Sequence, residues 1–185
     1  MAEPFRSVAA TRSLSATAWV LAMLCLPSLA ACASDGGDGG PPQAGVVLNE
    51  IVCAAIADGS FNPIGSDWAE LFNGSAEAVD LSGARLIDSK SKTFDEAMAL
   101  PAGTKIPALG YLVVFFNDQG FGNPVIEKGL SSSEALTFFG SDGLLLDQLD
   151  WKEGDCLEGA SWGRSPDGGS ALRAFDAPTP NAKNP

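Results

Sequence analysis

From Val46 onward, the apolar segments of this chain are short, and Gly, Pro, Asn, Asp and Ser separate them. Val, Leu, Phe and Trp dominate these segments, and few of them repeat with the period of an amphipathic helix. Frequent turn residues between short apolar runs favour an all-β fold over any α/β arrangement. We therefore predict a two-sheet β-sandwich over residues 46–185.

Local patterns place the strands of this sandwich. The longer predicted strands are Val46–Cys53, Trp68–Asn73, Ala84–Asp88, Tyr111–Phe116, Ala135–Gly140, Leu144–Trp151 and Ala160–Arg164, and shorter ones are expected around 98–100, 104–106 and 172–175. Asp142-Gly143 tolerates positive φ and predicts a hairpin between the two strands beside it. Within Leu144–Trp151 the apolar alternation changes phase, which indicates a bulge or a change of inward face midway.

Two connections stand out from the tight turns. The segment from Ala54 to Ser66 is too long for a hairpin loop, so it is a candidate functional or variable loop. A short helical turn is expected near Thr93–Ala99.

Residues 1–31 have the features of a signal peptide. Two arginines precede an apolar run from Ala16 to Leu29, which is short for about 30 Å of hydrocarbon and lacks a basic flank after it. The run ends in Leu-Ala-Ala-Cys, which resembles the lipobox of bacterial lipoproteins. This resemblance implies cleavage before Cys32 and lipid attachment to its sulfur. The alternative is an ordinary cleavage site with an incidental cysteine.

Lipid attachment predicts a stable membrane anchor, because two or more acyl chains, such as palmitate, bind a bilayer far more firmly than one. Ala33 follows the cysteine, and by the sorting rule of enteric lipoproteins a residue other than Asp there implies the outer membrane. Residues 32–45 are rich in Gly, Asp and Pro and have few apolar side chains, which predicts a flexible linker.

The chain is acidic, with a formal net charge of −12 and no histidine. Loss of residues 1–31 removes one acidic and two basic side chains, so the net charge of the mature chain becomes −13. Nucleic acids and anionic lipid head groups are bound by clustered Lys and Arg, and no such cluster is present. We expect no nucleic-acid partner.

The cysteines predict one disulfide. Cys25 lies in the signal peptide and Cys32 receives the lipid, which leaves Cys53 and Cys156 as a pair in an oxidising compartment. We predict that these two are bonded. Two separate buried thiols are the alternative.

The order of motifs from residue 46 to the C-terminus resembles the bacterial lamin-tail domain. The matching segments are Val46–Ile51, Asp67–Asn73, Val79–Gly83, Leu100–Pro107, Gly110–Phe115, Ser161–Arg164, Pro166–Gly168 and Pro178–Ala182. No single segment is specific, but their order and spacing are. The resemblance implies an immunoglobulin-like β-sandwich.

Most familiar catalytic arrangements are missing. The lack of histidine excludes Ser-His-Asp and Cys-His catalysis and histidine-bearing zinc sites. The two remaining cysteines are too far apart in sequence for a redox CxxC motif or a cysteine cluster. We therefore predict a non-catalytic protein without a metal or other cofactor.

Three groups of residues keep alternatives open. Glu50 and Glu70 can serve as an acid-base pair or bind a cation if their strands are neighbours; alternatively, each faces solvent or accepts hydrogen bonds from a nearby loop. An acidic group near residue 150 can coordinate calcium or form a solvated edge. An aromatic group can form a sugar-stacking platform or pack in the core. The acidic group is Asp147, Asp150, Glu153, Asp155 and Glu158, and the aromatic group is Trp68, Tyr111, Trp151 and Trp162.

These expectations favour a lipid-anchored, non-catalytic cell-envelope module that binds a protein or glycan or spaces other components. The alternative is a calcium- or carboxylate-dependent protein that binds or hydrolyses carbohydrate. That alternative requires the carboxylates to converge in a cleft. The sequence indicates no oligomeric state.

Overall fold

The computed structural model describes residues 45–89, 93–97, 99–116, 124–126 and 129–185. The predicted signal peptide, the lipidation site Cys32 and all but the last residue of the predicted linker lie outside the described residues. The account below concerns the domain that follows them.

The described chain is built from strands and one short 3₁₀ helix, Phe94–Glu96. The strands are β1 (Val46–Val52), β2 (Trp68–Asn73), β3 (Val79–Asp80), β4 (Arg85–Asp88), β5 (Lys105–Ile106), β6 (Tyr111–Phe116), β7 (Val125–Ile126), β8 (Glu134–Phe139), β9 (Leu145–Trp151), β10 (Ser161–Arg164) and β11 (Leu172–Phe175). Each longer predicted strand is present within a residue or two of its predicted ends. β3 and β7 were not predicted, and the expected piece at 98–100 is reduced to a bridge between Arg85 and Ala99.

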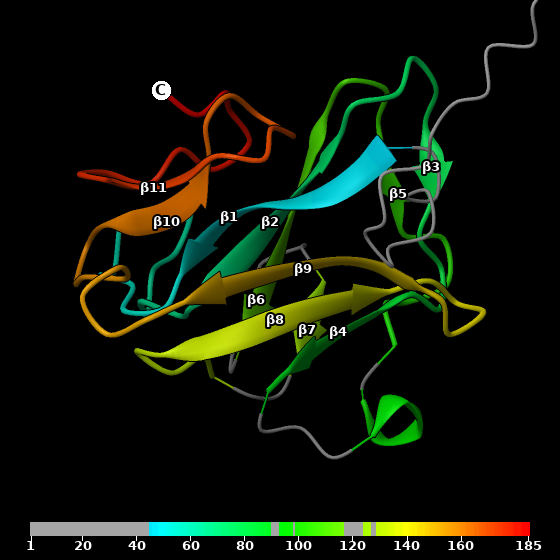
Figure 1. Cartoon of the computed structure of the whole chain (residues 1–185), viewed down its shortest axis with the longest axis horizontal. Coiled ribbons are helices and arrows are strands. Elements are labelled where there is room, and N and C mark those ends of the chain that lie inside the picture. Colours follow the sequence, from blue (N-terminus) through cyan, green and yellow to red (C-terminus); the bar gives the residue numbers. More distant parts are fainter. Residues whose placement is uncertain (1–44, 90–92, 98, 117–123, 127–128) are drawn as a thin grey trace, which may run out of the picture. The chain divides into compact units, whose positions relative to one another are not determined.

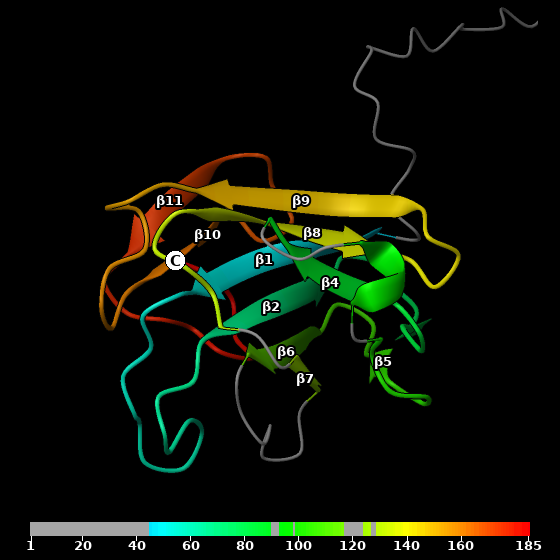
Figure 2. The ribbon, with the colours of Figure 1, turned by 90° about the horizontal axis from the view of Figure 1, so that it is seen from below.

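The strands form two facing sheets. The larger sheet has the order β11-β10-β1-β2-β6-β7, and its neighbours are antiparallel except for the parallel pair β6 and β7. The second sheet has the order β4-β8-β9 and lies across the first as a separate layer (Figures 1 and 2). β3 and β5 pair separately. The predicted all-β sandwich is confirmed.

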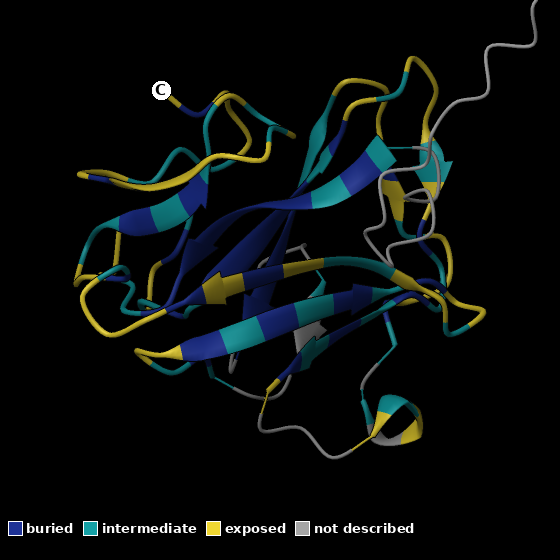
Figure 3. Cartoon of the chain, in the orientation of Figure 1, coloured by how far each residue is buried: buried dark blue, intermediate teal, exposed yellow. Residues whose placement is uncertain are grey.

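Apolar side chains from both sheets fill the space between the layers. Burial of a Leu or Phe side chain contributes about 1.5–3 kcal/mol, so this cluster is the main stabilising feature of the fold. Figure 3 shows β1 and β2 buried along most of their length, whereas β9 is exposed over part of its surface. The largest fully buried members are Leu48, Ile51, Leu71, Leu86, Ile106, Phe116, Leu136, Phe138 and Leu149.

A bulge in β1 decides which side chains face the core. The register of β1 against β2 shifts between Leu48 and Glu50, so Asn49 has no partner of its own. Such an extra residue moves the following side chains to the opposite face. Leu48 and Ile51 therefore both join the core cluster, while Glu50 faces the outside of the larger sheet.

The predicted hairpin joins β8 and β9, and Gly143 at its tip has a φ of 81°. The predicted irregularity in β9 is confirmed, because the register shifts between Phe138 and Phe139 and leaves Leu146 without a partner in β8. The bulge lies near the start of the strand. It turns Asp147 towards β1.

The outer face of the larger sheet is covered by protein. Residues 54–66, predicted as a long loop, pack Phe61 against one part of this face. Residues 176–185, here called the C-terminal tail, fold back over another part. Beneath them lies a second apolar cluster of Val52, Trp68, Val113 and Phe115.

Candidate functional site

Glu50 of β1 and Glu70 of β2 are cross-strand partners, and both are 0% exposed. Directly opposed residues of an antiparallel pair have Cβ atoms about 4.5–5.5 Å apart, so the two side chains share one small volume. The expectation that their strands could be neighbours is confirmed. Neither side chain faces solvent, because the C-terminal tail covers both.

Glu50 accepts hydrogen bonds at both carboxylate oxygens. Oε1 accepts from Ser161 Oγ and from the backbone N–H of Thr179, the latter at 3.0 Å, and Oε2 accepts from Thr179 Oγ1 at 3.1 Å. Burial raises the pKa of Glu50 above its ordinary value, and these hydrogen bonds oppose the rise. The residue thus ties the tail to the sheet.

Glu70 is less well satisfied. Its Oε2 accepts the backbone N–H of Asn181, whereas Oε1 has no hydrogen-bonding partner among the described residues. Burial raises the pKa of Glu70 to about 8, and the negative charge of Glu50 adds to the rise, while the Asn181 N–H opposes it. The carboxyl group is therefore mostly protonated at neutral pH.

Asp167 holds the tail at a second point. Its Oδ1 accepts from Asn49 Nδ2 at 3.1 Å and from the backbone N–H of Asn184 at 3.0 Å. Its Oδ2 accepts the Tyr111 hydroxyl at 2.7 Å. Burial, together with this carboxylate, raises the pKa of Tyr111, so the hydroxyl remains a donor. The β1 bulge residue Asn49 thus takes part in fixing the tail.

This arrangement is a closed polar seam between sheet and tail. A general acid or base must come within hydrogen-bonding reach of its substrate. Glu50 and Glu70 meet that condition only if the tail moves away. Their observed partners correspond to the alternative in which each carboxyl accepts hydrogen bonds from a nearby segment.

The acidic residues proposed as calcium ligands are dispersed. Asp147 pairs with Arg164 at 2.9 Å. Asp150 accepts from Gln148, and Asp155 accepts the backbone N–H of Lys152. Within the described part of the chain, no group of three or more His, Cys, Asp or Glu side chains is placed to hold a metal ion.

Arg164 has a role that the sequence did not reveal. Its Nε donates to Leu48 O at 2.7 Å and one terminal nitrogen donates to Gly169 O at 2.7 Å, while the other meets Asp147. Asp147 in turn accepts the Leu48 N–H at 2.8 Å. The two side chains therefore satisfy the backbone groups of Leu48 beside the β1 bulge and connect the two sheets.

The aromatic residues do not form an exposed platform. Trp68 and Trp151 are each 2% exposed, and Trp151 Nε1 donates to Ser131 O. Trp162 is partly buried against the core. Tyr111 packs against Phe72 in a tilted arrangement and donates to Asp167. The packing alternative is the one observed.

The disulfide between Cys53 and Cys156 is present, with a Cα–Cα distance of 5.9 Å, which confirms that prediction. It joins residues 54–66 to residues 152–160, and we call these two segments the loop end. The backbone N–H of Gly159 also donates to Ala54 O at 3.0 Å. Two independent links thus hold the loop end together.

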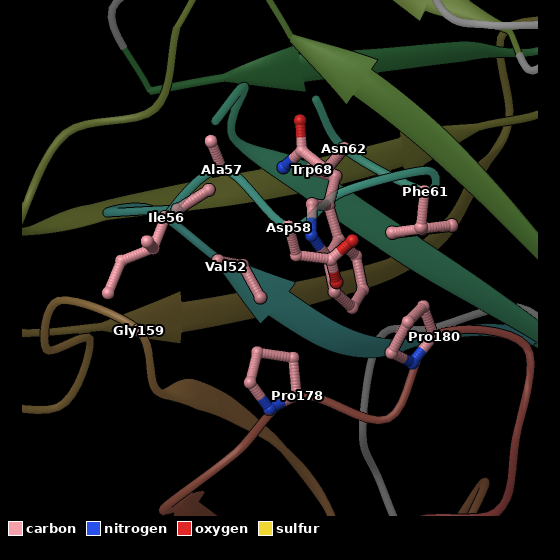
Figure 4. A pocket seen from close by; sticks show the side chains of 11 residues that line it. Val52, Ile56, Ala57, Asp58, Phe61, Asn62, Trp68, Gly159, Pro178 and Pro180 are labelled. Atoms are coloured by element: carbon pink, nitrogen blue, oxygen red, sulfur yellow. The ribbon is translucent and has the colours of Figure 1, made fainter. Parts of the chain in front are cut away.

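A pocket of about 170 Å³ opens at the loop end (Figure 4). Residues of the long loop, β1, β2, Gly159 and the C-terminal tail surround it. Its rim continues into exposed apolar surface, since Ile56 is 55% exposed and Leu157 is 57% exposed. The main lining side chains are Val52, Ile56, Asp58, Phe61, Trp68, Pro178 and Pro180.

No helix within the described residues is long and apolar enough to cross a membrane. Comparison with models of known protein families and with curated proteins found no match for this chain.

Proposed function

We propose that this chain is a non-catalytic, lipid-anchored binding module of the cell envelope, attached to the outer membrane through Cys32. Its partner is a protein or glycan of the envelope, and its domain is of the lamin-tail type. The loop end carries this proposal, because exposed apolar side chains lie there beside a pocket on loops linked by a disulfide. Loops held in one conformation lose less entropy on binding.

Two further observations support the proposal. A disulfide between residues 53 and 156 fits an exported protein, since such bonds persist in oxidising compartments. The burial of Glu50 and Glu70 under the tail argues against the alternative of a carboxylate-dependent hydrolase, whose carboxyl groups must reach the substrate.

The anchor is tested by metabolic labelling with an alkyne fatty acid, followed by membrane fractionation. We expect the wild-type chain to be labelled and to sediment with outer membranes. Cys32→Ala should be unlabelled and released from the membrane. A labelled or fully membrane-bound Cys32→Ala chain would contradict the proposed anchor.

The binding role is tested by recovering partners from detergent-solubilised envelopes with the intact lipoprotein. Ile56→Ser and Leu157→Ser, which remove apolar surface without adding charge, should reduce recovery of a specific partner at least tenfold. Leu144→Ser is the matched control, because Leu144 is 65% exposed and lies between β8 and β9, outside the loop end. Equal recovery by all variants would exclude the loop end as the binding surface.

A further inference from the structure

We infer that the pocket at the loop end receives a single cationic side chain, lysine or arginine, of the envelope partner. The inference rests on the proposed binding function and specifies the chemistry of its partner. It follows from the size of the pocket, its one available polar group and the charge around it.

The size of the pocket suits one side chain. Sites for drug-sized ligands occupy roughly 300–1,000 Å³, whereas this pocket has about 170 Å³. Val52, Phe61 and Trp68 give it an apolar floor, with Phe61 and Trp68 in edge-to-face contact at 6.0 Å. Such a floor suits the methylene stem of a long side chain, which can be buried while its charged end stays near water.

The tail closes one side of the pocket with Pro178 and Pro180 (Figure 4). Proline has no backbone N–H, so this wall offers no donor to an anion. Thr179 lies between the two prolines, and its backbone N–H donates to Glu50. The seam beneath the tail therefore fixes the position of this wall.

Asp58 supplies the available polar group. It is exposed, lines the pocket, and its carboxylate has no hydrogen-bonding or ionic partner among the described residues. The other polar lining side chain, Asn62, is occupied, because its Nδ2 donates to Ser66 O and its Oδ1 accepts the Ser66 N–H, both at 2.8 Å. A free carboxylate beside an apolar floor is complementary to a cation on an apolar stem.

The surrounding charge favours the same partner. Glu153 and Glu158 are exposed on the loop end together with Asp58, against one exposed base there, Lys152. The whole chain has a net charge of −12. Complementary potentials speed encounter with a basic partner and disfavour an acidic one.

The direct test uses the full-length lipoprotein in detergent micelles, labelled with ¹⁵N. Four blocked glycine pentapeptides with a central lysine, arginine, N-acetyl-lysine or glutamate are the probes. We expect the lysine and arginine peptides to shift the amide signals of Asp58 and Phe61 saturably. The acetyl-lysine peptide should bind about tenfold more weakly, since it loses the charge-assisted contact.

Asp58→Asn should weaken binding of the lysine peptide about tenfold. Glu158→Gln is the matched control, because it removes an exposed charge of the same loop end without altering the pocket lining. If the control weakens binding as much as Asp58→Asn, general acidic attraction explains the result and the pocket assignment is wrong. Equal binding of the lysine and acetyl-lysine peptides also overturns the inference.

Partner recovery separates this inference from the function on which it rests. Loss of the partner with both Ile56→Ser and Asp58→Asn supports both the binding role of the loop end and the cationic contact. Loss with Ile56→Ser alone keeps the binding module but rejects the cationic contact. If neither variant affects recovery, both the binding role of the loop end and the cationic contact are rejected.

Discussion

Glu70 is held as a neutral acid, whereas its cross-strand partner Glu50 accepts hydrogen bonds at both oxygens. Two adjacent buried carboxyl groups cannot both ionise without strong repulsion and loss of hydration. The three donor groups that Ser161 and Thr179 direct at Glu50 favour a negative charge there. The hydrogen bonds to Glu50 therefore oppose the effect of burial on its pKa, whereas burial dominates the pKa of Glu70.

This difference predicts opposite responses to isosteric substitution at pH 7. Glu70→Gln should change the free energy of unfolding by less than about 1 kcal/mol, because one neutral group replaces another. Glu50→Gln should lower it by about 1–3 kcal/mol, because an amide NH₂ then faces donors that lose their acceptor. Urea unfolding at pH 7 measures both. An equal loss in the two variants would show that Glu70 is not held in the neutral form.

Arg164 predicts a second effect at this scale. Its guanidinium donates to Leu48 O, Gly169 O and Asp147 at once, which a single ammonium group cannot reproduce. Arg164→Lys should therefore lower the free energy of unfolding by about 2–3 kcal/mol. Arg173→Lys, on the exposed strand β11, is the control and should be nearly silent. Thermal unfolding measures both variants. Similar losses of stability in Arg164→Lys and Arg173→Lys would contradict the proposed role of Arg164.

Among the elements, the loop end depends on its disulfide. The bond closes a long stretch of chain, with a sequence separation of 103. Replacing both Cys53 and Cys156 by Ala should lower the free energy of unfolding by about 2–4 kcal/mol. Denaturant unfolding measures the loss, with unreduced wild-type protein as reference. If alkylation of the unreduced, unfolded wild-type chain modifies both Cys53 and Cys156, the disulfide is absent and this prediction is wrong.

The longer strands were predictable because each has enough residues to show its pattern and a turn residue at its end. β3 and β7 were missed because two residues carry no period, and only their partners β5 and β6 define them. The bulge at Asn49 was not predicted, because the apolar pairs Val46-Val47 and Ile51-Val52 on either side of Asn49 and Glu50 define no single alternation.

The polar seam was predictable only as a pair of candidates. Glu50 and Glu70 stood out because charged residues are uncommon in apolar strands, and the structure places the two side by side. Their partners Thr179 and Asn181 lie in a proline-rich segment with no strand or helix pattern. Its return over the sheet is a tertiary event that local sequence does not specify. The pairing of Arg164 with Asp147 was not predicted for the same reason.

For the whole molecule, the raised pKa values predict a stability that falls as pH rises. A carboxyl group with a pKa raised by folding binds its proton more tightly in the folded chain, so its contribution is complete below the unfolded value and lost through the folded value. Burial raises the pKa of Glu50, Asp67 and Glu70, the last from 4.5 to about 8. The chain has no histidine to titrate in the same window.

We therefore expect the midpoint of thermal unfolding to decrease steadily between pH 5 and 9, by an amount equivalent to a few kcal/mol. Glu70→Gln should flatten most of this slope above pH 6. Calorimetry at matched ionic strength measures both curves. A wild-type midpoint that is constant or rises across this range would show that Glu70 has an ordinary pKa.

The first strand of the sandwich, β1, depends on contacts with residues that come far later in the chain. β1 lies between β2 and β10, and Glu50 receives its Thr179 hydrogen bonds from 129 positions away. A nascent chain in which only β1 to β9 have been synthesised still has one unpaired edge on β1, and the carboxyl groups of Glu50 and Glu70 are not yet covered. The domain consequently cannot complete its fold until the last residues of the chain are available.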